Sequence, residues 1–143
     1  MGVIADATLQ AGGEVVGIIP DHLVRLEVGH ASATELFVVR TMHERKQKMA
    51  DLSDGFAVLP GGLGTLDETF EIITWKQLRL HDKPIVLVDV AGYWKPLAGM
   101  VEHMIKEGFV QPAHRRLFGV VDKVEDVIPT LEAMPAPAFS PDV

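Results

Sequence analysis

The sequence predicts an α/β protein of the Rossmann-like, doubly wound kind, in which a parallel sheet carries helices on both faces. Short apolar runs alternate along the chain with longer segments of helical periodicity, as in folds built from strand–helix–strand units. The runs are almost continuously apolar, which is typical of parallel strands buried on both faces. At residues 56–68 such a run leads through a glycine-rich turn into a helix, and doubly wound folds bind ligands at such strand ends.

The first half of the chain contains three predicted strands and two predicted helices. Two glycines at 12–13 end a short first helix, and Pro20 ends the strand that follows it. Residues 21–32 mix polar and apolar positions, which indicates a loop with at most a short helix. Thr41 is the expected N-cap of the next helix. The expected bounds are helix 1–11, strand 14–19, strand 36–39, helix 41–52 and strand 55–59.

The second half continues the alternation. Its central helix is expected to begin at Thr65, with Glu68 three residues later as the partner in a capping box. Gly108 ends the next helix, and Pro129 predicts an irregularity in the last one. Residues 1–133 are expected to form a single nucleotide-binding domain. The expected bounds are helix 65–80, strand 85–88, helix 93–107, a weak strand 119–121, helix 124–133 and a loose, proline-rich tail 134–143.

The composition is that of one soluble domain. The 143 residues are 48% hydrophobic and 23% charged, and no apolar run approaches the roughly 20 residues that a membrane helix needs. The N-terminus shows no basic segment followed by an apolar one, so no signal peptide is expected. Cysteine is absent, which excludes disulfides, thiol nucleophiles and cysteine zinc sites and favours a cytoplasmic location.

Charge and histidine spacing narrow the range of partners. The formal net charge is −7, and nucleic-acid backbones are bound by basic surfaces, so no nucleic-acid partner is expected. The six histidines show no paired ligand spacing, which predicts no metal site. A small anion can still be bound by local donors within an acidic protein.

The most informative segment is the turn at residues 60–65, where Pro60 and three glycines separate a strand from a helix. Glycine lets the backbone approach a ligand closely, and free N–H groups at a helix start attract anions, above all phosphate. The spacing differs from that of the P-loop, since no lysine follows the last glycine, and from Gly-x-Gly-x-x-Gly. Glycine turns also occur where nothing binds, so a purely structural turn is the alternative interpretation.

Several segments, in the right order, resemble the LONELY GUY family. Residues 60–68, Pro-Gly-Gly-Leu-Gly-Thr-Leu-Asp-Glu, match its Pro-Gly-Gly-x-Gly-Thr-x-x-Glu signature. Residues 42–49 resemble its Arg-Lys helix, and residues 74–78 and 81–84 match further parts of its pattern. The resemblance extends from residue 1 to about residue 126. Family members are cytokinin riboside 5′-monophosphate phosphoribohydrolases, and many bacterial ones carry an older label as lysine decarboxylases.

The resemblance implies roles for individual residues. Arg45 and Glu68 are the expected catalytic residues. The expected substrate contacts are Glu27, Lys46, Gly61, Gly62, Leu63, Gly64, Thr65 and Thr74. No cofactor is expected, because water is the second substrate of the hydrolysis.

The chemistry gives Glu68 a specific task. Cleavage of an N-glycosidic bond passes through an oxocarbenium-like ribose, which a nearby carboxylate stabilises while it orients or deprotonates water. The spacing from Gly64 and Thr65 places such a carboxylate one helical turn from the phosphate anchor. The alternative interpretations are that Glu68 only caps the helix, and that Arg45 and Lys46 are only solvated surface charges.

A homodimer is expected as well, with the active sites beside the interface as the resemblance implies. Ile72 and Trp75 would broaden the apolar surface of the central helix, and a helix apolar over more than one stripe usually buries a second face. The stripe expected to face the sheet consists of Leu66, Phe70, Ile73 and Leu78.

Three functions are compatible with these interpretations. The leading one is hydrolysis of a purine nucleoside 5′-monophosphate, with an N6-substituted adenine, to the free base and ribose 5-phosphate. The second is a nucleotide-binding or carrier module without turnover. One feature supports this second function: the sequence resembles a family member that lacks the N-terminal strand and a second glycine loop. The third is a pyridoxal-phosphate lysine decarboxylase, but Lys76 and Lys83 show no setting for the required Schiff base.

Overall fold

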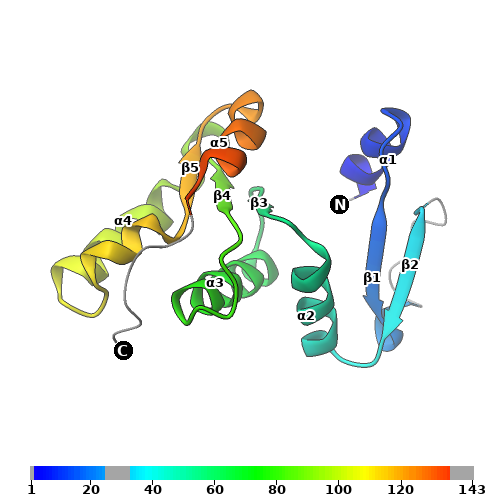
Figure 1. Cartoon of the computed structure of the whole chain (residues 1–143), viewed down its shortest axis with the longest axis horizontal. Helices are drawn as coiled ribbons and strands as arrows, with labels where there is room; N and C mark the ends of the chain where they lie inside the picture. Colours follow the sequence, from blue (N-terminus) through cyan, green and yellow to red (C-terminus); the bar gives the residue numbers. More distant parts are fainter. Residues whose placement is uncertain (1, 25–32, 136–143) are drawn as a thin grey trace. The chain divides into compact units, whose positions relative to one another are not determined.

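The computed structural model describes residues 2–24 and 33–135. The chain divides into two compact units, residues 1–53 and 54–143. The strands form two parallel sheets flanked by helices, which confirms the predicted α/β class (Figure 1). One continuous sheet was expected, whereas the described strands pair as a two-stranded and a three-stranded sheet. The alternation of patterns identifies strands but does not say which of them are neighbours. A single domain stays a prediction.

The first unit is a two-stranded parallel sheet with one helix packed on it. Its elements are α1 (Gly2–Gln10), β1 (Val16–Pro20), the 3-10 turn Asp21–Leu23, β2 (Glu35–Val39) and α2 (Met42–Leu52). The register runs from Val16 opposite Glu35 to Pro20 opposite Val39. Helix α2 packs on both strands, and the Lys48 ammonium lies 3.8 Å from the centre of the Phe37 ring. This cation–π contact ties the helix to β2.

The second unit is a three-stranded parallel sheet in the order β3-β4-β5. Every residue of the central strand is buried, as expected for a parallel strand covered on both faces. The elements are β3 (Phe56–Val58), α3 (Leu63–Gln77), β4 (Ile85–Val88), α4 (Lys95–Lys106), β5 (Gly119–Val121) and α5 (Val127–Ala133), with 3-10 turns at Val90–Gly92, Pro112–Leu117 and Val124–Asp126.

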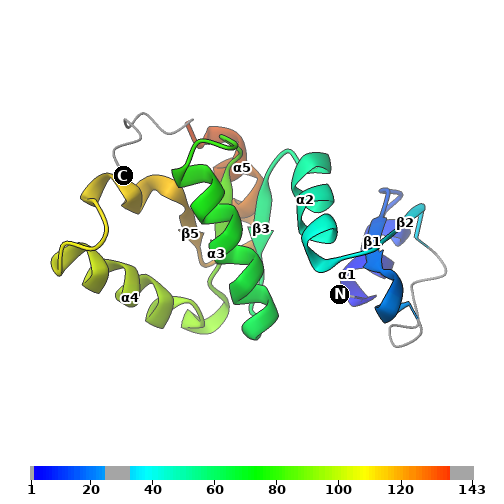
Figure 2. The same ribbon diagram turned by 90° about the horizontal axis from the view of Figure 1, so that it is seen from below.

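Alternate residues of β4 face two different layers of helix. Ile85 and Leu87 belong to the main core cluster, together with Ile73 of α3 and Leu97 of α4. Helix α5 packs against β4 and β5 on the other face, and Figure 2 shows α3 and α5 on opposite sides of this sheet. The predicted arrangement, with helices on both faces of a parallel sheet, is therefore present in this unit.

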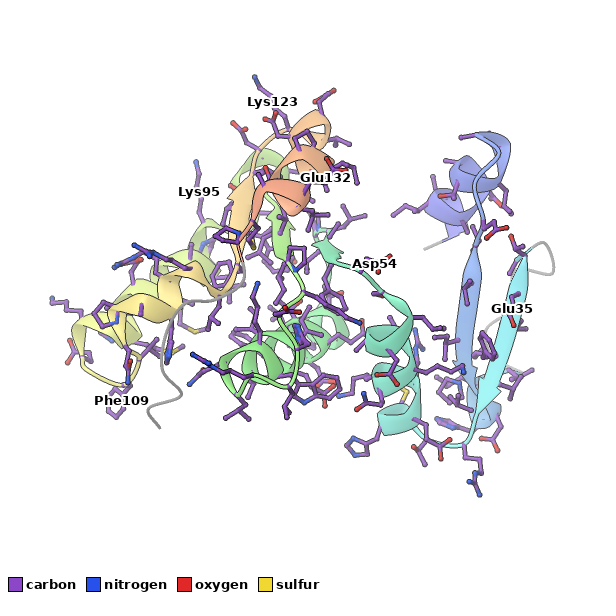
Figure 3. The ribbon with its side chains drawn as sticks, viewed as in Figure 1. Glu35, Asp54, Lys95, Phe109, Lys123 and Glu132 are labelled. Carbon is purple, nitrogen blue, oxygen red and sulfur yellow. The ribbon has the colours of Figure 1, made fainter. Side chains whose placement is uncertain are left out.

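The ends of α4 agree closely with the sequence signals. Gly108 adopts the left-handed conformation (φ 81°) just after the helix, where an L-residue with a side chain would be strained. Figure 3 shows Lys95 and Phe109 at its two ends, and Phe109 is 86% exposed. Among the described residues, no helix is both long enough and apolar enough to cross a membrane.

Helix α3 faces the core with most of the predicted stripe, because Ile73 is buried and Leu66 and Phe70 pack, partly buried, against the core cluster. Its buried residues are Thr69, Ile73 and Lys76, which are spaced as one helical face. Leu78 was expected on that face, but it is the C-cap residue and is half exposed. Lys76 takes the core position instead and is 0% exposed.

Lys76 is an unusual core residue, because its amine is buried against a weak hydrogen-bond acceptor. Its Nζ donates to the Met134 sulfur at 3.7 Å, and thioether sulfur is a weak acceptor. Burial lowers the pKa of Lys76, and the charge of Asp82 offsets part of this effect. Met134 is therefore held in the second unit, although it was predicted to begin a loose tail.

We expect Lys76→Met to raise the free energy of unfolding at pH 7. The gain should be on the order of 1 kcal/mol, the low end of the range seen when apolar residues of similar volume replace buried charged groups. The pKa of Lys76 is lower in the folded state than in the unfolded state. The destabilisation that this lysine causes in the parent therefore grows as the pH falls from the unfolded-state pKa of 10.5 to the folded-state pKa. Urea unfolding of both proteins at pH 7 and pH 9.5 should show the difference shrinking at the higher pH. Equal free energies of unfolding at pH 7 would contradict the conclusion that buried Lys76 destabilises the fold.

The His81–Pro84 segment, which matches part of the family pattern, joins α3 to β4 and is held by hydrogen bonds of His81. The His81 Nε2 lies 2.9 Å from the Ile72 carbonyl oxygen, which can only accept, so this nitrogen carries the proton. The Lys83 backbone N–H then donates to His81 Nδ1 at 3.1 Å. Burial lowers the pKa of His81, which favours this neutral form. The segment thus fixes the entry into β4.

Candidate functional site

The candidate site lies at the carboxyl end of β3, in the turn that leads into α3. Strand β4 is the parallel neighbour of β3, so the loops after these two strands leave the same edge of the sheet. The predicted strand–turn–helix arrangement at residues 56–68 is confirmed in its order of elements. Ligands of open α/β sheets bind at this kind of edge.

Helix α3 begins earlier than predicted, and its N-terminus has no side-chain cap from any residue that the structure describes. Gly62 is the N-cap, with extended backbone angles (φ −93°, ψ −154°), and the Leu66 N–H donates to its carbonyl at 3.1 Å. The predicted capping box of Thr65 with Glu68 is therefore wrong, because glycine also serves as an N-cap and Thr65 lies in the first turn. The N–H groups of residues 63–65 precede the first intrahelical bond and can bind an anion.

Helix α2 provides the contrast within the same chain. Its predicted N-cap is confirmed, since the Thr41 hydroxyl accepts from the Glu44 N–H at 3.1 Å. The Glu44 carboxylate in turn accepts from the Arg40 N–H at 2.8 Å. Side chains therefore satisfy the start of α2, whereas the start of α3 is formed by glycine, and no side chain of the described residues caps it.

Two side chains confine Gly61, the residue before this N-cap. A Cβ atom on Gly61 would collide with the Thr65 hydroxyl, so only glycine fits here. The Tyr93 hydroxyl donates to the Gly61 carbonyl at 2.5 Å. Sequence reasoning missed Tyr93. The available signal was its place just after the strand at 85–88, at the edge where the glycine turn also lies.

The acidic candidate lies in the same helix as the turn. Glu68 is partly exposed on α3, three residues after Thr65 and four after Gly64, so it shares a helix face with the open N-terminus. Thr74 is exposed on α3 six residues further on, which is roughly 120° around the helix from Glu68. The structure thus brings together the turn and Glu68, while a contact between Thr74 and the same ligand stays a prediction.

The remaining candidates belong to the first unit. Arg45 and Lys46 lie in the first turns of α2 and are partly buried. The Arg45 Nε atom is buried and has no hydrogen-bond partner within the described residues. A buried donor of a charged group is costly when unpaired, so it requires an explanation such as an anionic ligand. Glu27 lies outside the described residues.

Within residues 2–24 and 33–135, no group of three or more histidine, aspartate and glutamate side chains could hold a metal ion.

Comparison with known proteins gives consistent matches over nearly the whole chain. A family model described as "Possible lysine decarboxylase" matches residues 1–131. The cytokinin riboside 5′-monophosphate phosphoribohydrolase of Rhodococcoides fascians is 45% identical over 134 residues, which cover 93% of this chain and 68% of the relative. Two Arabidopsis thaliana proteins that bear the same activity in their names are also similar.

Of these two, LOG5 is 41% identical over 133 residues, which cover 93% of this chain and 58% of the relative. LOG1 is 40% identical over 139 residues, which cover 92% of this chain and 65% of the relative. The chain therefore spans about 58–68% of the length of these three relatives.

Proposed function

The chain belongs to the family described as possible lysine decarboxylase, the LONELY GUY family, and on this basis we propose that it hydrolyses a purine nucleoside 5′-monophosphate. The products would be the free base, with adenine or an N6-substituted adenine as the base, and ribose 5-phosphate. The observation that carries the proposal is the uncapped N-terminus of α3, with Glu68 one turn from the glycine turn at its start. The activity named for the relatives supports the same reaction.

The proposed binding step uses backbone groups. The 5′-phosphate would accept from the N–H groups at residues 62–65, where the helix dipole also favours a negative charge. Arg45 and Lys46 are proposed as a catalytic residue and a substrate contact. The buried Arg45 Nε has no hydrogen-bond partner among residues 2–24 and 33–135, which supports an anionic partner, because guanidinium groups bind phosphate and carboxylate through paired donors.

The proposed chemical step uses the Glu68 carboxylate. As the bond between ribose C1′ and the purine nitrogen breaks, its electron pair leaves with the base, and positive charge develops on the ribose. A carboxylate stabilises this charge and accepts a proton from the water that attacks C1′. The departing base takes up a proton from the carboxylate or from solvent, so that water supplies both the hydroxyl group on C1′ and the proton on the base. Water is the second substrate of this hydrolysis, and no cofactor takes part in it.

The family description also mentions a lysine decarboxylase, whose pyridoxal phosphate forms a Schiff base with a lysine. Lys76 does not fit this role, because its side chain is 0% exposed and its amine contacts Met134. A fully buried amine of this kind cannot present itself to a cofactor, so no step of such chemistry is assigned to it.

The test of the proposed function is incubation of the protein with AMP and with N6-isopentenyl-AMP, followed by chromatography of the products. We expect the free base to appear from at least one of them, and ribose 5-phosphate to accumulate with it. A protein that binds these nucleotides and returns them unchanged would instead be a carrier module. A cytoplasmic location stays a prediction from the sequence.

We propose a homodimer as the state in solution. Ile72 packs against the core cluster, but Trp75 of α3 is only partly buried, and Leu78 and Leu80, which follow the helix, are 51% and 69% exposed. This apolar surface beyond the buried stripe supports burial against a second copy. Sedimentation at micromolar concentration should give twice the chain mass of 15.6 kDa. A single species of 15.6 kDa would refute the dimer.

A further inference from the structure

A hydrogen bond between two loops of the second unit links Tyr93 to the glycine turn. The Tyr93 hydroxyl donates to the Gly61 carbonyl at 2.5 Å, across 32 residues of sequence. Tyr93 follows β4 and Gly61 follows β3, so the bond joins the carboxyl ends of two neighbouring parallel strands. The Tyr93 side chain is 49% exposed, so the bond is not a requirement of the core.

Tyr93 is held in place by its own surroundings. Its ring packs edge-on against Trp94, with centroids 4.9 Å apart, and Trp94 is buried. The buried Asp89 carboxylate accepts from the Trp94 backbone N–H at 2.6 Å, and the Asp89 N–H donates to the Val121 carbonyl at 2.7 Å. The position of Tyr93 is therefore set by the end of the β4–β5 ladder.

The turn that precedes Tyr93 carries backbone strain. Ala91 has φ 53°, in the left-handed region that residues with a Cβ atom rarely adopt, and Gly92 has φ 78°. Strain of this kind costs of order 1–3 kcal/mol and is found most often at functional sites. The strained residue lies two positions before Tyr93, whose hydroxyl contacts the glycine turn.

The contact controls which peptide atoms the turn presents. The carbonyl of Gly61 and the N–H of Gly62 belong to one planar peptide and point in opposite directions. When the carbonyl is held by Tyr93, the N–H of Gly62 points away from Tyr93. A flip of this glycine peptide would exchange the two groups, and a carbonyl oxygen would repel an anion where an N–H attracts it.

We propose that Tyr93 is a positioning residue that holds the Gly61–Gly62 peptide in the orientation suited to anion binding. This inference rests on the proposed function only for the identity of the anion, the 5′-phosphate of the substrate. Tyr93 itself needs no contact with the substrate. Its contribution is the preorganisation of the turn, which reduces the cost of ordering a flexible glycine segment on binding.

The test is Tyr93→Phe, which keeps the ring and removes the hydroxyl. We expect the Kd for AMP and for ribose 5-phosphate, measured by calorimetry, to rise about tenfold, the scale of one lost hydrogen bond. KM for AMP should rise with Kd while kcat stays within about threefold, because the variant loses binding and not chemistry. Glu102→Gln is the matched control, since it weakens an exposed pair with Arg115 in the same unit and should leave AMP binding unchanged.

A second measurement does not depend on turnover or on added nucleotide. Amide hydrogen exchange of residues 61–66 should be faster in Tyr93→Phe than in the parent, while exchange of β4 stays the same. Unchanged exchange of residues 61–66, or equal AMP affinity of variant and parent, would overturn the inference. If the parent binds AMP without cleaving it and the variant binds more weakly, the proposed function fails and the role of Tyr93 stands.

Discussion

Replacement of Glu68 with glutamine is expected to lower the rate of AMP hydrolysis by at least about a hundredfold, the scale of a lost acid/base or electrostatic group. Glutamine has nearly the size of glutamate and can still form hydrogen bonds, but it is uncharged and cannot stabilise an oxocarbenium ion or accept a proton. AMP binding should persist, because the phosphate is proposed to be held by backbone N–H groups at the start of α3. Steady-state kinetics and calorimetry on the same preparations measure the two effects separately.

The stability of Glu68→Gln should match that of the parent. Because α3 begins at Leu63 with Gly62 as its N-cap, Glu68 has no capping role whose loss would change the melting temperature. Glu71→Gln is the control, since it removes the same charge from the same helix one turn further on and should change kcat less than about threefold. If Glu68→Gln hydrolyses AMP at the parental rate, Glu68 is not a catalytic residue.

The second large effect is expected for Gly62→Val, which should raise the Kd for AMP by at least about a hundredfold, close to the loss of a whole phosphate site. A Cβ atom at Gly62 would meet nothing within 4 Å, and its φ of −93° suits any residue, so the variant should fold normally. The valine side chain then occupies space beside the turn through which the phosphate must reach the backbone.

Gly99→Val offers a matched control for this substitution. Gly99 lies in α4, and a Cβ atom there would also meet nothing within 4 Å. Its variant should bind AMP as the parent does, which separates the effect of a blocked turn from that of adding valine to the surface. If Gly62→Val binds AMP with parental affinity, the phosphate is bound elsewhere.

Local signals in the sequence were sufficient for most elements. The apolar run at residues 85–88 became a fully buried parallel strand, as its composition required. Thr41 capped α2, and Gly108 took the left-handed conformation that ends α4. Pro129 lies in the first turn of α5, where its missing N–H has no helical partner to lose, and a 3-10 turn precedes that helix.

The errors came from features that local signals leave undecided. Both Gly62 and Thr65 can serve as N-caps, and the strong capping-box pattern favoured the wrong one. Lys76 was not expected in the core because hydrophobic periodicity assigns lysine to the surface, yet its long aliphatic chain fills the face shared with Ile73.

Tyr93 could not be placed from periodicity at all. Its contact with Gly61 joins segments 32 residues apart, and it depends on the adjacency of β3 and β4 in the sheet. The same limit applies to strand order, because the pattern of apolar runs gives no register between strands. The positions of the glycine turn and of Glu68, which are local in sequence, could therefore be predicted, whereas the contact between Tyr93 and the turn could not.

The most direct test of the proposed hydrolysis is the identity and ratio of the products formed from AMP in phosphate-free buffer. We predict adenine and ribose 5-phosphate in equal amounts, since water attacks C1′ while the 5′-phosphate stays attached to the ribose. Formation of adenosine and inorganic phosphate would contradict this mechanism, because the phosphate ester and not the N-glycosidic bond would then be the one that is cleaved.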